Sequence, residues 1–510
     1  MLAIMAMLAI LAMRNRAPRV SIGALHHDVL TREDRMHRAR RVFAILSAAS
    51  TILAAGGGEA SAQGRRPNIV MIVADDMGYA DIGVHGSKDI PTPNIDALAK
   101  TGIRFTDAYV TGPHCSPTRA GLLTGRYQQR FGHEVNMGAG AGPDAGLSLG
   151  ETTMADRLKT AGYRTALFGK WHLGFGERLH PLARGFDEFY GFLGGGHSYF
   201  EAASEGMNAL LEGRRRVEAT GYLTDVLTDR AVDFIKREKS RPFFLYLAYN
   251  AVHTPMHAPD KYLARFKGIA DEPRRTYAAM LSAMDDGIGR TLEALRTERL
   301  EEHTLVFFLS DNGGPMMAGT GVNGSRNAPL RGSKRQTWEG GIRVPFIMRW
   351  KGHLAEGKID ARPVIQLDIL PTALAAAGVT AQPEWKLDGV NLLPYVTGTD
   401  QRPPHETLYW RLFAHMAIRK GPWKLVKTME GPLSASDTTR PDLSGAQLFN
   451  LADDVGEQKD LAAARPEKVK ELSDDWLRWS KELAAPAWGP GGGGRGAASP
   501  ATDRLRQRRH

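Results

Sequence analysis

Five short apolar stretches stand out between residues 67 and 350, each bounded by polar or glycine-rich sequence. They read NIVMIVADD, RTALFGKWH, PFFLYLAYNAVH, TLVFFLSDNGG and RVPFIMRW. Several are continuous apolar runs without alternation, which is typical of strands buried on both faces of a parallel sheet. Each stretch is therefore predicted to form a β-strand of one large sheet.

Helical patterns lie between and after these stretches. The predicted helices cover residues 95–100, 153–161, 224–239, 274–297 and 364–377. Alternation of strands and helices along a chain indicates an α/β domain with a doubly wound, mostly parallel sheet. We place this domain, which carries the candidate catalytic residues, at residues 67–400.

The pattern changes after Asp400. ETLYWRLF, HMAIRKGPWKLVKT and AQLFNL read as short strands joined by tight turns, and a helix is predicted over residues 467–483. This order predicts a smaller C-terminal α+β subdomain with an antiparallel sheet, at residues 401–485. Residues 486–510 are rich in glycine and arginine, and we predict that this tail is disordered.

The first 62 residues are predicted to be a leader. From Met36, MHRARR is a positive segment, VFAILSAASTILAA is apolar and ASAQ is a small-residue cleavage site. This order predicts a signal peptide at residues 36–62, and a start codon assigned too early would explain the preceding 35 residues. Arg40 and Arg41 also resemble a twin-arginine signal. An uncleaved leader is the alternative.

These features predict a protein exported to the periplasm or secreted. No later run of about 18 apolar residues occurs, so no stable membrane insertion is expected.

The net charge of +10 would suit a nucleic-acid-binding protein if it were gathered on one surface. However, residues 1–62 hold eight arginines against four acidic residues, and residues 486–510 hold five against one. Because most of the charge lies in the two ends, no nucleic-acid partner is predicted.

Polar side chains follow four of the predicted strands at the point where each strand ends. They are Asp75 and Asp76, Lys170 and His172, His253, and Asp311 and Asn312. Ligands bind outside the carboxyl ends of strands in such sheets, so we expect these side chains to converge on one site. Their carboxylate and amide oxygens suit Ca²⁺ or Mg²⁺ better than Zn²⁺. Taken alone, the Asp-Asp pair would be an ordinary cap or turn.

The only cysteine of the chain, Cys115, lies in GPHCSPTRAGLLTGR. Pro117 predicts the start of a helix here, with Gly125 near its end. Cys115 would then lie at the helix N-terminus, where free N–H groups lower a thiol pKa, with Arg119 one turn later on the same side. A buried, unreactive cysteine is the alternative, and it accounts poorly for the neighbouring arginine.

These residues carry a family resemblance. CSPTR followed by LLTGR matches the C-x-P-x-R signature of type I sulfatases, and the resemblance extends from Pro67 to about Leu461 through PNIVMIVADDMGYADIGVHG, GYRTALFGKWHLG, HTPMHAP, LSDNGG, LRGSKRQTWEGG and LFNLADDVGEQKDL. It implies an alkaline-phosphatase-like α/β sandwich with a smaller C-terminal domain. It also implies oxidation of Cys115 to Cα-formylglycine by a formylglycine-generating enzyme or an anaerobic sulfatase-maturing enzyme.

The resemblance further implies a role for each polar residue. A cation, usually Ca²⁺ with Mg²⁺ as the alternative, would be held by Asp75, Asp76, Asp311, Asn312 and modified residue 115. One hydroxyl of the hydrated aldehyde would attack sulfur, and the second would allow sulfate to be expelled. The residues that would assist are Arg119 at the hydrate, Lys170 and Lys334 at sulfate oxygens, His253 or Lys334 at the leaving alcohol, and His172 as the final base.

The implied activity is hydrolysis of an aryl sulfate or a sulfated carbohydrate. One alternative is a phosphodiester or phosphonate monoester hydrolase on the same fold; another is an unmodified protein that only binds sulfated glycans. Loops at residues 194–221 and 316–327 are expected to shape the leaving-group side. We expect hydrogen-bonding or structural roles for the remaining notable residues, which are His114, His133, His257, Arg343, Trp338 and Trp410.

Overall fold

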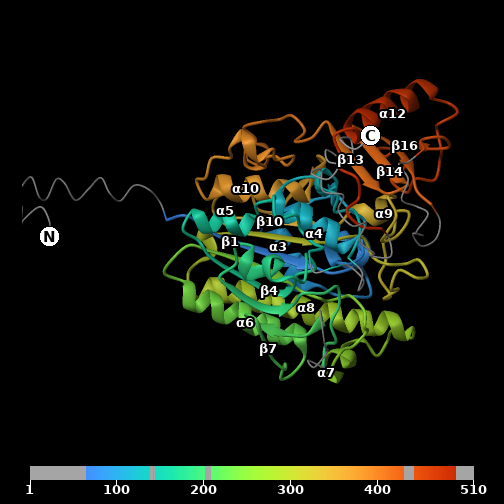
Figure 1. Cartoon of the computed structure of the whole chain (residues 1–510). Helices are drawn as coiled ribbons and strands as arrows, with labels where there is room; N and C mark the ends of the chain where they lie inside the picture. Colours follow the sequence, from blue (N-terminus) through green and yellow to red (C-terminus); the bar gives the residue numbers. More distant parts are fainter. Residues whose placement is uncertain (1–64, 138–141, 143, 201–207, 430–441, 490–510) are drawn as a thin grey trace, which may run out of the picture. The chain divides into compact units, whose positions relative to one another are not determined.

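The computed structural model describes residues 65–137, 142, 144–200, 208–429 and 442–489 (Figure 1). The predicted leader and signal peptide lie outside the described residues, as does most of the predicted tail. Within that tail, Trp488 is buried and its Nε1 donates a hydrogen bond to the carbonyl of Val135 at 3.0 Å, so the packed chain reaches at least this residue. None of the helices in the described ranges is long and apolar enough to span a bilayer.

A ten-stranded sheet organises the larger part of the fold. Its strands lie in the order β11 (Lys358–Asp360), β2 (Ile103–Phe105), β10 (Phe346–Arg349), β9 (Thr304–Ser310), β1 (Asn68–Ala74), β8 (Phe243–Ala248), β4 (Arg164–Lys170), β5 (Glu188–Phe192), β6 (Leu211–Glu212) and β7 (Arg215–Arg216). The five strands from β9 to β5 are parallel neighbours. The predicted mostly parallel sheet is therefore confirmed, whereas the RVPFIMRW run forms β10, which is antiparallel to β9.

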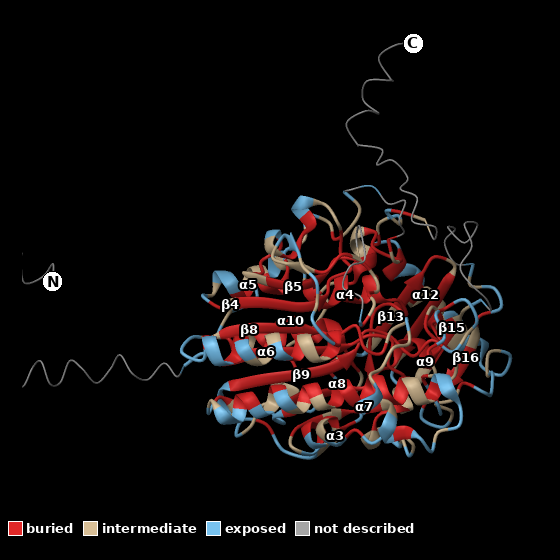
Figure 2. Ribbon diagram, turned by 90° about the horizontal axis from the view of Figure 1, so that it is seen from below, coloured by how far each residue is buried: buried red, intermediate tan, exposed pale blue. Residues whose placement is uncertain are grey.

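Helices cover both faces of this sheet (Figure 1), and Figure 2 shows that its central strands are buried. The first layer contains α3 (Pro93–Lys100), α6 (Leu223–Glu238) and α8 (Glu272–Thr297); the second contains α4 (Cys115–Thr124), α5 (Met154–Thr160) and α10 (Ile369–Ala376). Alternate residues of β1 enter the two cores, since Val70 and Ile72 face the first layer and Ile69 and Met71 the second. This double burial explains the continuous apolar strand sequences.

Four predicted helices lie within two residues of their expected ends, but the prediction over residues 364–377 is wrong at its start. Val364–Ile365 forms β12, which pairs in parallel with β3 (Ala108–Tyr109). A single 3₁₀ turn, η9 (Gln366–Asp368), then leads into α10. The two β-branched residues favour a strand, and the pairing partner that uses this preference is more than 250 residues away in the chain.

A separate four-stranded antiparallel sheet lies toward the C-terminus, as predicted. It consists of β13 (Thr407–Leu412), β14 (His415–Lys420), β15 (Trp423–Lys427) and β16 (Gln447–Asn450), covered by α12 (Pro466–Ser480). Trp338 and Trp410 are buried in the core of this sheet, and Trp410 Nε1 donates to the carbonyl of Val110 at 2.7 Å. Both tryptophans are therefore core residues, the structural role expected of them, and Trp410 also links the small sheet to the segment that follows β3.

A buried charge network also connects the small sheet to residues of the larger domain. Lys424 of β15 lies 2.9 Å from a carboxylate oxygen of Glu339 and 2.8 Å from one of Glu457, and all three side chains are inaccessible to solvent. Glu457 also accepts a hydrogen bond from the backbone N–H of Glu339 at 2.7 Å. Arg343 extends the network through ion pairs with Glu339 and Asp107, in agreement with its expected structural role. The network fixes the short helix α9 (Glu339–Ile342), which follows Lys334 by five residues.

Glu457→Gln is expected to change how stability depends on pH. Burial raises the pKa of Glu457 to about 7, and Glu339 adds to this rise while Lys424 opposes it. The native state holds the proton of Glu457 more tightly than the unfolded chain does. Protonated Glu457 therefore stabilises the fold fully below the ordinary glutamate pKa, and this stabilisation is lost as pH rises toward 7. In urea unfolding, the free energy of unfolding of wild type should fall by on the order of 1–3 kcal/mol between about pH 5 and pH 7. The variant should flatten this slope, whereas exposed Glu467→Gln should not; an equal slope in all three proteins would contradict the prediction.

Candidate active site

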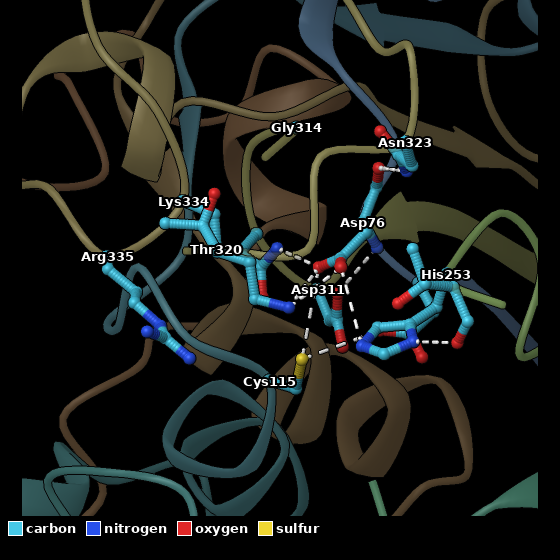
Figure 3. A network of polar contacts seen from close by, with 12 residues as sticks. Asp76, Cys115, His253, Asp311, Gly314, Thr320, Asn323, Lys334 and Arg335 are labelled. Atoms are coloured by element: carbon cyan, nitrogen blue, oxygen red, sulfur yellow. Dashed lines mark hydrogen bonds and ion pairs between the residues drawn. The ribbon is translucent and has the colours of Figure 1, made fainter. Parts of the chain in front are cut away.

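The carboxyl ends of β1 and β9 bring the predicted acidic residues together (Figure 3). Asp75 and Asp76 follow β1 directly, and Asp311 follows β9, the parallel neighbour of β1. The backbone N–H of Asp76 donates to Asp311 Oδ1 at 3.2 Å. The aspartates are fully buried. Sheet register thus places side chains that are 235 residues apart within one hydrogen bond of each other.

Cys115, the first residue of α4, points into this acidic cluster. Its Sγ lies 3.5 Å from Asp75 Oδ1 and 3.9 Å from Asp76 Oδ1. One ligand atom from each of Asp75, Asp76, Cys115 and Asp311 can be chosen so that all four lie within 4.8 Å of one another. The signature cysteine therefore lies together with the acidic residues that follow β1 and β9, as predicted.

Each of the three carboxylates has a basic partner. Lys170 Nζ lies 2.7 Å from Asp75, Lys334 Nζ lies 2.7 Å from Asp76, and Arg119 Nη2 lies 2.9 Å from Asp311. The six side chains are almost entirely excluded from water. Charge in a site of low polarity must be balanced, and three negative groups here meet three positive ones.

Arg119 lies one helical turn after Cys115 and is held from three sides. Besides Asp311, its guanidinium donates to the carbonyl of Lys170 at 3.2 Å and to the hydroxyl of Tyr246 at 3.3 Å. Burial alone would lower the pKa of Arg119, but Tyr246 and Asp311 raise it above the ordinary value. Sequence analysis missed Tyr246, because it lies inside the apolar run that forms β8 and resembles any other core residue.

The two candidate histidines differ in exposure. His253 Nε2 lies 3.5 Å from Asp76 Oδ2, its other ring nitrogen lies 2.6 Å from the Thr254 carbonyl oxygen, and its side chain is 21% exposed. His172 is buried beside Gly195, where a Cβ would come within 2.7 Å of the imidazole. Burial lowers the pKa of both histidines, which favours neutral rings at neutral pH. His253 therefore lies on the side of the cluster that solvent reaches.

Two local expectations fail at this site. A two-residue spacing on an extended backbone would point Lys170 and His172 the same way, but β4 ends at Lys170 and His172 has a left-handed φ of +57°. The helix N-terminus was expected to lower the pKa of Cys115, but burial raises it to about 12, against the opposing effect of Lys170. The negative charges of Asp311 and Asp75 add to this rise, so the thiol is neutral and a poor nucleophile.

The donor atoms fit a hard divalent cation. Asn312 Nδ2 donates to Asp76 Oδ1 at 2.7 Å, while Asn312 Oδ1 is buried with no hydrogen-bond partner in the described part of the chain. Three carboxylates and this amide oxygen are the ligand types that Ca²⁺ and Mg²⁺ prefer. The sulfur of Cys115 is the exception, because hard cations bind thiols weakly. An oxygen in place of that sulfur would complete a uniform set.

Other residues support the site from outside. Ser116 Oγ lies 2.6 Å from both His133 Nε2 and the His172 carbonyl oxygen, so His133 is the local hydrogen-bond partner that was expected. Asn323, in the loop at residues 316–327, donates to the carbonyl of Asp76 at 3.2 Å; no sequence signal had distinguished it from other loop residues. For His114 and His257, by contrast, Nδ1 is buried and without a partner among the described residues.

Comparison with known proteins identifies the family. A family model described as Sulfatase matches residues 67–379, more than half of the chain. The chain belongs to the sulfatase family. A second family model, described as N-sulphoglucosamine sulphohydrolase, C-terminal, matches residues 332–433 of this sulfatase. The predicted alkaline-phosphatase-like fold is confirmed, and the protein is a sulfuric ester hydrolase.

Similar sulfatases differ in the substrates that their names state. N-acetylgalactosamine-6-sulfatase of Canis lupus familiaris is 33% identical over 73% of this chain and 74% of its own length. Steryl-sulfatase of Mus musculus is 30% identical over 88% of this chain and 90% of its own length. The solved complex of Ps i-CgsB with k-i-k-neocarrahexaose is 38% identical, covers 83% of this chain and 95% of its own, and has a TM-score of 0.76. Family membership thus fixes the reaction class but leaves the leaving group open.

Proposed function

We propose that this sulfatase hydrolyses its sulfate ester through a formylglycine derived from Cys115, with Ca²⁺ or Mg²⁺ bound by Asp75, Asp76, Asp311, Asn312 and residue 115. The single observation that carries this proposal is that Cys115 Sγ points into a hard-oxygen cluster in which a thiol is neutral and poorly suited to the cation. A hydrated aldehyde carries two hydroxyl groups on one carbon, so one can attack sulfur and the other can permit release of sulfate.

The charge of the site supports an anionic substrate. Three carboxylates and three basic side chains balance each other, and a divalent cation would add two positive charges. Such preorganised charge favours an anion whose negative charge shifts toward the leaving oxygen in the transition state. A cation held by these residues would neutralise negative charge at residue 115 and at the sulfate ester.

Each basic residue has a task that its position permits. Lys170 and Lys334 bind sulfate oxygens, and Arg119 holds the modified side chain through its fixed position beside Asp311. His253, the more exposed histidine, or Lys334 assists the leaving alcohol, either as proton donor or by stabilising its charge. His172, neutral because it is buried, accepts the proton when sulfate is expelled.

The substrate is proposed to be a sulfated carbohydrate, with an aryl sulfate as the simplest probe. The alternative is a phosphodiester or phosphonate monoester hydrolase, which the same fold and charge could serve. We expect kcat/KM for 4-nitrophenyl sulfate to exceed that for bis-4-nitrophenyl phosphate and for 4-nitrophenyl phenylphosphonate. Faster hydrolysis of either phosphorus ester would favour the alternative.

The state of residue 115 separates catalysis from simple binding. An unmodified protein that only binds sulfated glycans would retain the thiol. Peptide mass spectrometry of protein made with a formylglycine-generating or anaerobic sulfatase-maturing enzyme should show the aldehyde, and sulfate release should appear with it. We also propose export to the periplasm or outside the cell, which the N-terminus of the mature protein, read from native material, would test.

A further inference from the structure

Arg335 lies next to catalytic candidate Lys334, yet the two side chains have different surroundings (Figure 3). Lys334 Nζ is buried against Asp76, whereas Arg335 is half-buried at the side of the carboxylate cluster. The backbone N–H of Arg335 donates to the carbonyl of Pro113 at 2.7 Å, two residues before Cys115. Its φ of +72° is rare for a side chain of this size. The backbone therefore holds Arg335 beside the signature segment in a conformation that needs support from its neighbours.

Among the residues that the structure describes, the guanidinium of Arg335 has no acidic partner. Within the described residues it forms no ion pair, and its Nε is buried without any hydrogen-bond partner. Nearby arginines are satisfied differently: Arg326 pairs with Asp89 at 3.0 Å, and Arg331 stacks on the ring of Trp338 at 3.8 Å. A partly desolvated cation without a counterion is unfavourable, so this one is available for an anion from outside.

The loop at residues 316–327 holds this guanidinium and also reaches the segment beside His253. Arg335 Nη1 donates to the carbonyl of Gly319 at 3.2 Å. Two residues later, a Cβ on Gly321 would lie 3.4 Å from Thr254 Oγ1, so the loop also reaches the residue that follows His253. Arg335 and the partly exposed His253 thus flank Cys115 in the view of Figure 3, and the loop that we expect to shape the leaving-group side lies against both.

We propose that Arg335 binds a second anionic group, a sulfate or a carboxylate, on the sugar that carries the scissile sulfate ester, so that polyanionic glycans are the preferred substrates. This inference rests on the proposed function and specifies its substrate class. A planar guanidinium suits both oxyanions because it can donate two parallel hydrogen bonds. An uncharged steroid or aryl leaving group would leave this cation unpaired, which disfavours such substrates.

The test compares oligosaccharides as inhibitors and substrates. The reporter is an aryl sulfate whose leaving group is uncharged. The panel contains one singly sulfated neutral oligosaccharide, one disulfated counterpart and one singly sulfated oligosaccharide with an adjacent uronic acid. Wild-type enzyme should bind at least one of the doubly anionic compounds ten-fold or more tightly than the singly sulfated oligosaccharide without a second anionic group. The measurement is the inhibition constant for 4-methylumbelliferyl sulfate hydrolysis. The preferred compound identifies whether sulfate or carboxylate is bound.

Arg335→Gln should reduce that preference to about three-fold or less, and Arg335→Lys should retain part of it. Arg326→Gln, which removes an equal charge from a paired arginine of the neighbouring loop, should retain the full preference. Equal weakening of all three oligosaccharides in Arg335→Gln would indicate a structural role and overturn the proposal, as would equal inhibition of wild type by all three. Absence of aryl sulfate hydrolysis by wild type carrying formylglycine would instead refute the proposed function.

Discussion

Cys115→Ala is expected to abolish sulfate ester hydrolysis, with kcat/KM lowered by at least about 10⁴-fold, because the nucleophile and one cation ligand are lost together. The fold should persist, since alanine removes only a small buried group, and the stability loss should be on the order of 1 kcal/mol. The measurement is hydrolysis of 4-nitrophenyl sulfate, together with the midpoint of thermal unfolding for both proteins.

The single cysteine provides an internal control for this prediction. Because the chain has no other thiol, the thiol content of unfolded protein equals its unmodified fraction. Preparations with different degrees of maturation should show activity that falls linearly as thiol content rises. Activity that increases with thiol content would mean that Cys115 itself is the nucleophile, which the raised pKa of its thiol argues against.

Asp311→Asn is expected to lower kcat/KM by at least about 10³-fold and cation affinity by about 100-fold or more. The substitution removes one carboxylate ligand and also the partner of Arg119, whose Nη2 lies 2.9 Å from Asp311. A buried guanidinium without its carboxylate costs about 3–5 kcal/mol of stability, although Asp75 at 3.9 Å compensates in part. Calcium titration by calorimetry on EDTA-treated protein measures the affinity, and urea unfolding measures the stability.

Asp285→Asn is the matched control for Asp311→Asn. Asp285 is likewise buried, but it accepts hydrogen bonds from the backbone N–H groups of Asn94 and Ile95 at the start of α3. Its loss should lower stability by about 1–2 kcal/mol without altering cation affinity. Similar calcium affinity in wild type and Asp311→Asn would show that the cation does not bind in this cluster.

Much of the site could be predicted because strand ends can be recognised in the sequence. Continuous apolar runs end at Asp75, Lys170 and Asp311, and parallel strands bring their carboxyl ends to one edge. The short spacing from Cys115 to Arg119 is one helical turn, which the structure contains as the first turn of α4. These features depend on local sequence and on one general property of parallel sheets, so no tertiary detail was needed.

Other features depended on which distant segments meet. The start of residues 364–377 became strand β12 because Ala108 and Tyr109 offered a pairing partner. Tyr246 acquired a polar role only because β8 carries its hydroxyl to Arg119. Neither outcome has a signal in the neighbouring sequence, since the deciding partner lies more than 100 residues away.

The sequence by itself determined the reaction class of this protein: the signature around Cys115, the acidic strand ends and the two lysines specify a sulfatase. Only the tertiary structure decided the electrostatics. Burial, which no local pattern reports, makes the Cys115 thiol neutral instead of reactive. The same packing pairs Lys170 and Lys334 with carboxylates, while Arg335 has no such partner in the described part of the chain. The physical reason is that desolvation and charge pairing depend on every group within a few ångströms, and most of those groups come from elsewhere in the chain.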